Sequence, residues 1–395
     1  MAFSLIIRIT MERLHNLKEA ICSFENLYAA YQEAAKDKRY REEVITFSQN
    51  LEENLIQLQR ELEGWYYKVG PYREFYVRYP KPRLVMALQF RDRIVQWAIY
   101  RQIDPYVDKR FITHSYGCRK GKGTLAAAEY LLDCLRIIDR KPDADDYVIV
   151  KGDISKYFYR VDHGKTMEMY ADISDDLWFL WIMDVIINNP DVPFGVPLGM
   201  SIDECPRDER LYDVGMPIGN LSSQETANIY LDKLDQYCKH VLKLHIYVRY
   251  MDDFIFICKR KDAERLFGLV TEFITKELML TVSPKSRILP ARSGCEFVGY
   301  RVTPHGLRLR KKTTKHMKKS LKHVAEMYAL GAIDLESALA TKQCYFGMTE
   351  HCNGQYMRQW IADHFVLCRN SGEDYIPQES LWFSDDPCDE GRLIA

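Results

Sequence analysis

Two adjacent acids, Asp252 and Asp253, interrupt an otherwise apolar stretch of the chain that reads VRYMDDFIFIC. Two carboxylates at a hairpin turn repel each other, so a bound cation is a natural reason for them to be there. An isolated Asp-Asp pair is more often a solvated turn. The long β-forming runs on both sides are poor sequence for a plain surface loop, and they favour the cation site. We therefore expect a hairpin of His245–Tyr250 and Phe254–Cys258 with the acids at its turn.

A third acid, Asp153, ends another apolar run, Tyr147–Gly152. It can meet Asp252 only if the two strands are neighbours in one sheet. Together these carboxylates would supply oxygen ligands to two Mg²⁺ ions about 3.5–4 Å apart. Such a pair of ions stabilises the attacking and leaving oxygens of an in-line phosphoryl displacement. That reaction class fits acids that have no nucleophilic Ser or Cys and no paired catalytic His nearby.

The elements that would position these acids mix helical and strand periods, which predicts an α+β fold. Strand patterns also occupy Arg73–Ala87, split by two prolines, and Glu296–Leu309, which reads as a second hairpin. A long loop rich in Pro, Gly and Asp is expected over Asp191–Gly215, and an acidic tail over Glu373–Glu390. Helical patterns cover about 13–63, 90–108, 123–140, 177–187, 222–242, 262–278 and 311–368.

The expected helix Ser222–Leu242 contains three polar residues that periodicity assigns to its exposed face. They are Asn228, Asp232 and Asp235.

Composition restricts the class of protein. The 395 residues carry a formal net charge of −1 and are 47% hydrophobic, which excludes a disordered chain and a generally cationic nucleic-acid coat. No apolar run reaches the roughly 20 residues that a membrane-spanning helix needs, so no membrane partner is expected. The 11 cysteines include no CxxC pair. Reduced thiols and a cytoplasmic location are therefore expected.

Five motifs in order carry a family resemblance. Tyr250–Asp253 resembles the YMDD box of reverse transcriptases, and Lys151–His163 (KGDISKYFYRVDH) resembles their first acid motif. The other three are Tyr79–Arg93 (YPKPRLVMALQFRDR), Gly215–Gln224 (GMPIGNLSSQ) and Glu296–Tyr300 (EFVGY). The resemblance implies a right-hand polymerase with fingers, a palm of antiparallel sheet plus helices, and a helical thumb.

By this resemblance the chain divides into four parts. Residues 1–145 would form N-terminal helices and fingers that interleave with the palm, residues 146–305 the palm, 306–368 the thumb and 369–395 the acidic tail.

The third motif indicates a subfamily. Most reverse transcriptases carry Gln-Gly and end this motif Ser-Pro, whereas this chain has Ile218-Gly219 and ends Ser223-Gln224. That pattern resembles the enzymes of diversity-generating retroelements, as does Phe111–Thr124. In that family the enzyme, encoded by bacteria, phages or mobile elements, copies a template-repeat RNA into error-prone cDNA for mutagenic retrohoming. The implied partners are template RNA, a DNA primer or cDNA, dNTPs and a small basic oligomeric accessory variability protein.

The resemblance also implies roles for the acid cluster and its surroundings. Asp153 and Asp252 would bind two Mg²⁺ ions, for which Mn²⁺ can substitute, with the Ile154 carbonyl as a further ligand and Asp253 completing the cluster. Phe158 would exclude a ribose 2′-OH, and the alternative is that Tyr157 or Phe158 is ordinary core. The residues expected around the dNTP are Lys81, Arg83, Phe158, Ile218, Gly219, Gln224 and Lys285.

Lys81 and Arg83 would clamp the triphosphate, although a lone Lys-x-Arg is more often a solvated edge. Gly219 would let the backbone approach the nascent base pair. Ile218 replaces a polar side chain, and the loss of its hydrogen bond is a hypothesis for low fidelity. Lys285 would lie near the leaving pyrophosphate, with a plain surface Lys as the alternative.

A basic run of eight Lys and Arg without an acid spans Arg308–Lys322. Such a run is usually a solvated helix face, but beside a polymerase cleft we expect it to contact phosphates of the template–primer duplex. Arg91 and Arg93 would be template or structural contacts. The expected nucleic-acid-binding residues are Arg91, Arg93, Lys120, Lys122, Arg308, Arg310, Lys311, Lys312, Lys315 and Lys319.

Two alternatives remain open from the sequence. One is another bacterial reverse transcriptase, such as a retron, group II intron-like or antiviral defence enzyme. The other is a non-catalytic RNA-binding scaffold on the same fold, which the presence of all three acids disfavours.

Overall fold

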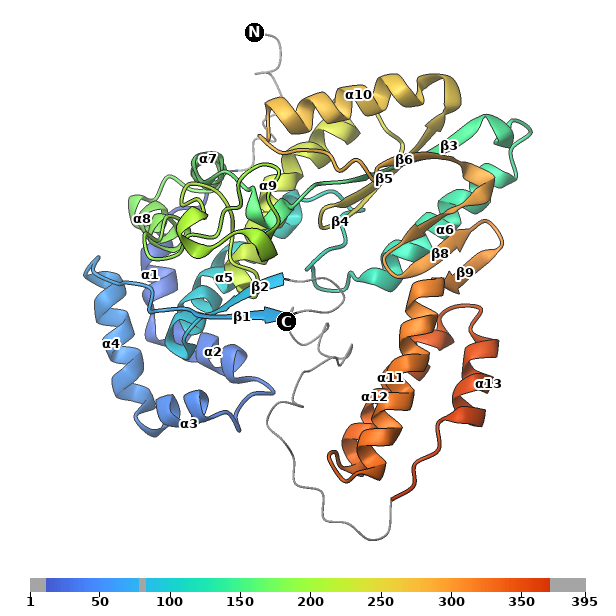
Figure 1. The fold of residues 1–395 in the computed structure, drawn as a ribbon. Coiled ribbons are helices and arrows are strands. Elements are labelled where there is room, and N and C mark those ends of the chain that lie inside the picture. The colour runs from blue at the N-terminus through green and yellow to red at the C-terminus, as the bar shows by residue number, and fades with distance from the viewer. Residues whose placement is uncertain (1–11, 78–82, 370–395) are drawn as a thin grey trace. The chain divides into compact units, whose positions relative to one another are not determined.

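The computed structural model describes residues 12–77 and 83–369. Helices and antiparallel strands alternate along the chain, which confirms the expected α+β class (Figure 1). The helices are α1 (Leu17–Cys22), α2 (Phe24–Ala35), α3 (Glu42–Gln49), α4 (Leu51–Glu63), α5 (Phe90–Arg110), α6 (Thr124–Asp139), α7 (His163–Ile173), α8 (Leu177–Ile187), α9 (Leu221–Gln236), α10 (Arg260–Lys276), α11 (Lys311–Ala329), α12 (Leu335–Glu350) and α13 (Gln355–His364). The strands are β1 (Arg73–Val77), β2 (Arg83–Ala87), β3 (Tyr147–Asp153), β4 (Ile246–Tyr250), β5 (Asp253–Lys259), β6 (Arg287–Pro290), β7 (Cys295–Phe297), β8 (Tyr300–Thr303) and β9 (Gly306–Leu309).

The residues group by proximity into two compact units. Unit 1 consists of Met1–Arg119, Gly152–Phe254 and Glu264–Ser286. Unit 2 consists of Lys120–Lys151, Ile255–Ala263 and Arg287–Ala395. This grouping differs from the four parts expected from the sequence, and the fingers, palm and thumb stay a prediction.

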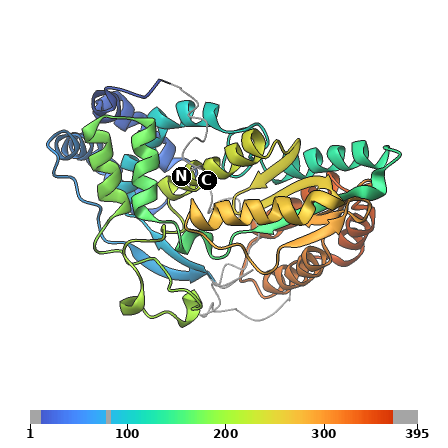
Figure 2. The ribbon, with the colours of Figure 1, turned by 90° about the horizontal axis from the view of Figure 1, so that it is seen from above.

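The N-terminal part of unit 1 is a set of short amphipathic helices. The Ser23 hydroxyl caps α2 by accepting the Asn26 N–H at 3.3 Å, a common way to satisfy a free helix N–H. In the same unit, β1 and β2 pair antiparallel in the register Arg73↔Ala87, as the two short strand patterns predict. Helices α7 and α8 lie side by side (Figure 2).

The sheet that carries the acids has the strand order β4–β5–β3–β6. Its β3 and β5 are runs of buried apolar residues, as expected for strands covered on both faces. Gly152 of β3 lies against the fully buried ring of Phe254 in β5, and a Cβ at Gly152 would lie 2.0 Å from Cζ of that ring. Glycine is therefore required here for the two acid-bearing strands to pack.

The expectation that the polar residues of α9 face solvent is wrong. Asn228, Asp232 and Asp235 are 2%, 8% and 0% exposed. Polar residues at helical spacing normally mark the solvated face of a helix. Here each of the three is buried and has hydrogen-bond partners inside unit 1. Asp232, for example, accepts the Gln236 amide at 2.9 Å.

In unit 2, α11 and its neighbours α12 and α13 share a small apolar core. Met317 and Leu321 of α11 pack with Tyr345, Met357 and Ile361. The expected second hairpin is instead a sheet of three strands, β7–β8–β9. A turn at positive φ, 41° at Val298 and 94° at Gly299, breaks the first expected strand in two.

No helix in the described part of the chain is both long and apolar enough to cross a membrane. Nine described cysteines are free thiols, as expected, whereas Cys344 is disulfide-bonded and contradicts that expectation.

Candidate active site

The sheet brings the three acids together in unit 1. Asp153 is the last residue of β3 and Asp253 the first of β5, while Asp252 occupies the turn between β4 and β5. Because β3 and β5 are neighbours in the sheet, the two strand ends meet, as the sequence requires. The Ile154 N–H donates to the Asp252 carbonyl at 3.2 Å and fixes the backbone of one acid beside the other.

A segment after α10 holds Asp153 from the opposite side. The Ser283 N–H donates to the Asp153 carbonyl at 2.7 Å, and the Asp153 N–H donates to the Ser286 hydroxyl at 3.3 Å. Lys285 lies between these two serines and is exposed. The expected approach of Lys285 to a pyrophosphate stays a prediction.

The acids perturb one another electrostatically. Burial, followed by repulsion from Asp253 and Asp153, raises the pKa of Asp252 to about 7. Arg83 of β2 acts in the opposite direction, which places its charge within electrostatic reach of the acids although its side chain is exposed. A cation among these carboxylates would relieve the repulsion that raises this pKa.

The donors fit a hard divalent cation by their chemistry, since Mg²⁺ and Mn²⁺ prefer carboxylate and carbonyl oxygens. Asp153, Asp252 and the backbone at Ile154 are the groups that would hold it. Within residues 12–77 and 83–369, no three His, Cys, Asp or Glu side chains already converge as a complete ligand set. Binding of a cation would therefore draw on carbonyl oxygens, water or substrate as well, which is usual for Mg²⁺.

Of the residues expected around the dNTP, Phe158, Ile218 and Gly219 lie close to one another in unit 1. The Met86 N–H of β2 donates to the Ile218 carbonyl at 3.1 Å, so the third motif runs beside β2. Gly219 has φ 107°, and a Cβ there would lie 3.0 Å from Cγ1 of Val85. Both the left-handed backbone and the close approach of Val85 call for glycine.

Phe158 and Ile218 pack against the same apolar cluster, which includes Leu84 and Met86. The Met216 N–H donates to the Phe158 carbonyl at 2.6 Å and holds the first and third motifs together. Tyr157, the other aromatic candidate, is 2% exposed and donates its hydroxyl to the Ala227 carbonyl. Tyr157 is therefore core, and Phe158 is the half-buried ring of the two.

The remaining predicted contacts differ in their surroundings. Arg91 pairs with Glu61, and Arg93 pairs with Glu43 at 2.8 Å, so both already have partners within unit 1. Gln224 lies half-buried in the first turn of α9. Lys81 lies outside the described residues. Lys120 is exposed and Lys122 half-buried in the segment before α6 of unit 2.

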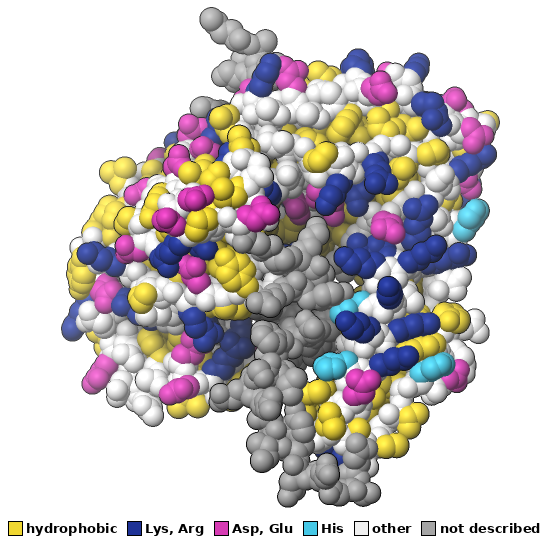
Figure 3. Space-filling view, in the orientation of Figure 1, with side chains coloured by type: hydrophobic (Ala, Val, Ile, Leu, Met, Phe, Trp, Pro, Cys, Tyr) yellow, Lys and Arg dark blue, Asp and Glu magenta, His cyan; other side chains and the backbone are white. Residues whose placement is uncertain are grey.

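The basic run of unit 2 forms the N-terminal half of α11 and the strand before it. Lys and Arg side chains gather on the visible face around the start of α11 (Figure 3). Lys318 is held over the rings of Tyr356 and Trp360, at 4.8 and 4.9 Å from their centroids. The side chains that remain exposed are those of Arg308, Lys311, Lys312, Lys315, Lys319 and Lys322.

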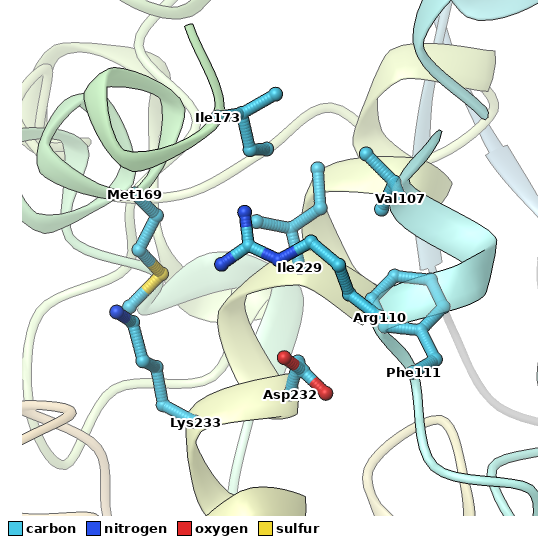
Figure 4. Close-up of a pocket in the computed structure, with 8 residues that line it drawn as sticks. All are labelled: Val107, Arg110, Phe111, Met169, Ile173, Ile229, Asp232 and Lys233. Carbon is cyan, nitrogen blue, oxygen red and sulfur yellow. The ribbon is translucent and has the colours of Figure 1, made fainter. Parts of the chain in front are cut away.

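A cavity away from the acids is lined by residues of α5, α7 and α9 (Figure 4). Its volume of about 20 Å³ holds roughly one water molecule, too little for a nucleotide. Asp232 and Arg110 point into it. The cavity is therefore too small to hold a substrate, and the acid turn is the better candidate for the active site.

Sequence reasoning missed Arg249, which is fully buried two residues before Met251 and forms a salt bridge with Asp235 at 2.7 Å. A signal was present, because an Arg inside an apolar strand needs a buried carboxylate partner. That partner was hidden by its assignment to the exposed face of α9.

Known proteins provide a comparison. The profile of the family "Reverse transcriptase (RNA-dependent DNA polymerase)" matches residues 78–302, more than half of the chain. Protein YkfC of Escherichia coli (strain K12) is 28% identical over 184 residues, which are 46% of this chain. The match spans 44% of the length of that relative.

Two solved structures of Candida tropicalis apo telomerase are also similar. The first has a TM-score of 0.45 at 10% identity and covers 66% of this chain and 53% of the telomerase. A form truncated from the C-terminal domain has a TM-score of 0.42 at 13% identity and covers 61% and 55%.

Proposed function

The chain belongs to the reverse transcriptase (RNA-dependent DNA polymerase) family, and we propose that it synthesises DNA on an RNA template by two-metal-ion nucleotidyl transfer. One observation carries the proposal. Adjacent strands bring Asp153 and Asp252 together at a turn where burial, followed by repulsion from Asp253 and Asp153, raises the pKa of Asp252 to about 7. The substrates would be a template RNA, a DNA primer and dNTPs.

Two divalent ions, Mg²⁺ or Mn²⁺, would supply charge for the attacking primer oxygen and the leaving pyrophosphate. The chain's own part is to hold and orient. Asp153 and Asp252 would hold the ions with the Ile154 carbonyl, and Asp253 would support the cluster. Backbone hydrogen bonds at Asp153 and Asp252 keep these acids in place before substrate arrives.

Nucleotide selection would rest on the surfaces next to the acids. Arg83, together with Lys81, would clamp the triphosphate, and Lys285 would lie near the pyrophosphate. The half-buried Phe158 ring would obstruct a ribose 2′-OH. Gly219 would let the backbone approach the new base pair, with Gln224 following in α9.

Within the family we propose a diversity-generating retroelement enzyme that works in the cytoplasm of a bacterium. The motif Gly215–Gln224 supports this, because Ile218 stands where other members carry a polar side chain. An apolar residue there removes a hydrogen bond that would select geometry at the incoming nucleotide. A small basic accessory variability protein would help to bind the template RNA, since this chain is nearly neutral.

Replacement of Ile218 by Gln tests the subfamily assignment. The cDNA made on an adenine-rich RNA template is sequenced for wild type and for I218Q, and we expect the variant to make several-fold fewer errors opposite adenine. Val192→Gln is the matched control, because Val192 packs against the same apolar cluster. An unchanged error rate in I218Q contradicts the hypothesis.

A further inference from the structure

The catalytic turn contains a backbone conformation that needs support. Met251, the residue before Asp252, has φ 52°. A left-handed backbone is unfavourable for a non-glycine residue, because its Cβ crowds the neighbouring carbonyl oxygen. Such a conformation persists only where the surroundings hold it in place, and this is common at active sites.

The first support is the segment around Gly117, near the end of the first stretch of unit 1. A Cβ at Gly117 would lie 2.6 Å from Sδ and 2.8 Å from the backbone nitrogen of Met251. The absence of a side chain at Gly117 therefore leaves room for the turn. The Asn228 amide donates to the Gly117 carbonyl at 2.8 Å and holds that segment against α9.

The second support is Arg249, which is 0% exposed. Its Nη1 donates to the Met251 carbonyl at 3.1 Å. Its Nε and Nη2 donate to the two carboxylate oxygens of Asp235, at 2.8 and 2.7 Å. Burial alone would lower the pKa of Arg249, but the neighbouring Asp235 carboxylate more than offsets this effect and the net shift is upward. Arg249 therefore stays a cation.

Two further contacts hold the guanidinium itself, and Asp235 has one more donor. Nη2 also donates to the Ser115 hydroxyl at 3.0 Å, and Nη1 lies 3.3 Å from the Asn228 side-chain oxygen. The Tyr247 hydroxyl donates to Asp235 at 2.8 Å. A bidentate, fully buried guanidinium has little freedom to move, so the carbonyl that it contacts is restrained as well.

We propose that Arg249 is a positioning residue for catalysis, which holds the Met251–Asp252 peptide so that Asp252 stays beside Asp153. Asp252 is then held on both sides, because Arg249 binds the carbonyl before it and the Ile154 N–H binds its own carbonyl. The proposal rests on the proposed polymerase activity. A buried ion pair often adds little to the stability of a protein. Stability alone is therefore a weak explanation for the Arg249–Asp235 pair, and a role in holding the turn explains it better.

Arg249→Lys tests this role, because Lys can pair with Asp235 but lacks the fork that also reaches Met251. We expect kcat per folded molecule to fall roughly 10- to 100-fold, as for small misplacements of catalytic groups, while KM for dNTP and the Kd for template–primer stay within about twofold. Tyr247→Phe is the matched control: it removes one buried hydrogen bond from the same carboxylate and leaves the Met251 contact intact. Its kcat should equal that of wild type.

Binding of Mn²⁺ to the enzyme without nucleic acid, followed by electron paramagnetic resonance, gives a readout that does not depend on polymerisation. We expect weaker binding in Arg249→Lys and unchanged binding in Tyr247→Phe. If Arg249→Lys does not fold, the double variant Arg249→Met with Asp235→Asn decides the question, because it leaves no buried charge unpaired.

The proposal would be overturned if a folded Arg249 variant had the same kcat and the same Mn²⁺ affinity as wild type. If wild type does not polymerise DNA, the proposed function is contradicted instead. The Mn²⁺ titration would then still show whether Arg249 supports the cation site.

Discussion

At the scale of single residues, two acids have similarly raised pKa values but lie in different surroundings. Asp252 and Asp232 both have pKa values raised to about 7, and burial is the largest cause in each. The second contribution differs: Asp253 raises the pKa of Asp252, and Asp235 raises that of Asp232. Of the two, only Asp252 is also affected by an acid from another strand, Asp153 of β3. Because both pKa values are raised alike, a raised pKa alone does not identify the site.

Asp232 provides a pH prediction. Its pKa in the folded protein is about 7, above its ordinary value of 3.8, so the folded state binds the proton more tightly. Its contribution to stability is therefore greatest below pH 4 and is lost as the pH rises to 7. We expect Asp232→Asn to be more stable than wild type at pH 8, with the advantage shrinking by about 1.4 kcal/mol per pH unit from pH 7 to pH 5.

Urea unfolding of wild type and Asp232→Asn at several pH values measures this difference. A difference that does not change with pH would contradict the burial of a protonated carboxyl beside the cavity of α5, α7 and α9.

At the scale of elements, the packing of β3 on β5 determines how the acids meet. We expect Gly152→Ala to lower the free energy of unfolding by about 1–3 kcal/mol, because the added methyl overlaps the buried Phe254 ring. Activity should fall as well, since the overlap displaces the strands that carry Asp153 and Asp253. Denaturant unfolding and primer extension measure the two effects.

Gly268→Ala in α10 is the control, because no atom lies within 4 Å of the added methyl. It should leave activity unchanged and stabilise the helix by about 0.5–1 kcal/mol. Equal stability of Gly152→Ala and wild type would show that the two strands do not pack as described.

Sequence periodicity predicted these elements well where burial alone decides the pattern. The apolar runs of β3 and β5 and the acids at their ends were evident, because strands covered on both faces read as continuous apolar sequence. The polar face of α9 was misassigned for a physical reason. Asp235 is buried because it pairs with Arg249, and a pairing between distant residues leaves no trace in the period of either segment.

The site shows the same limit. Motif register selected Phe158 over Tyr157, but only the structure shows that Tyr157 is core and donates its hydroxyl to Ala227. The contacts of Arg249 with Met251 and Ser115 could not be predicted, since they depend on how three separate segments pack.

At the scale of the whole molecule, charge is balanced overall and concentrated locally. The chain has 55 Lys and Arg against 56 Asp and Glu, yet α11 begins with a run of basic residues that remain exposed. Phosphate contacts by such a run would make binding depend on salt, because each contact releases counterions. A nearly neutral chain with a local basic surface fits the proposal of a basic partner for its RNA.

Replacement of Lys311, Lys315 and Lys319 by Gln tests the basic surface. We expect the slope of log Kobs against log salt for a template–primer duplex to become shallower by about 2–3. Lys318→Gln is the matched control on the same helix, because Lys318 is already held over Tyr356 and Trp360. An unchanged slope in the triple variant would place the duplex elsewhere.

Mg²⁺-dependent dNTP incorporation on an RNA template by wild type, Asp252→Asn and Asp232→Asn tests whether the acid turn is the polymerase active site. Both substitutions remove a carboxyl whose pKa is raised to about 7, but of the two only Asp252 lies at the turn beside Asp153 and Asp253. We expect wild type and Asp232→Asn to polymerise DNA and folded Asp252→Asn to lose at least about 10³-fold of the activity. Comparable incorporation by Asp252→Asn, or none by wild type, would contradict this assignment.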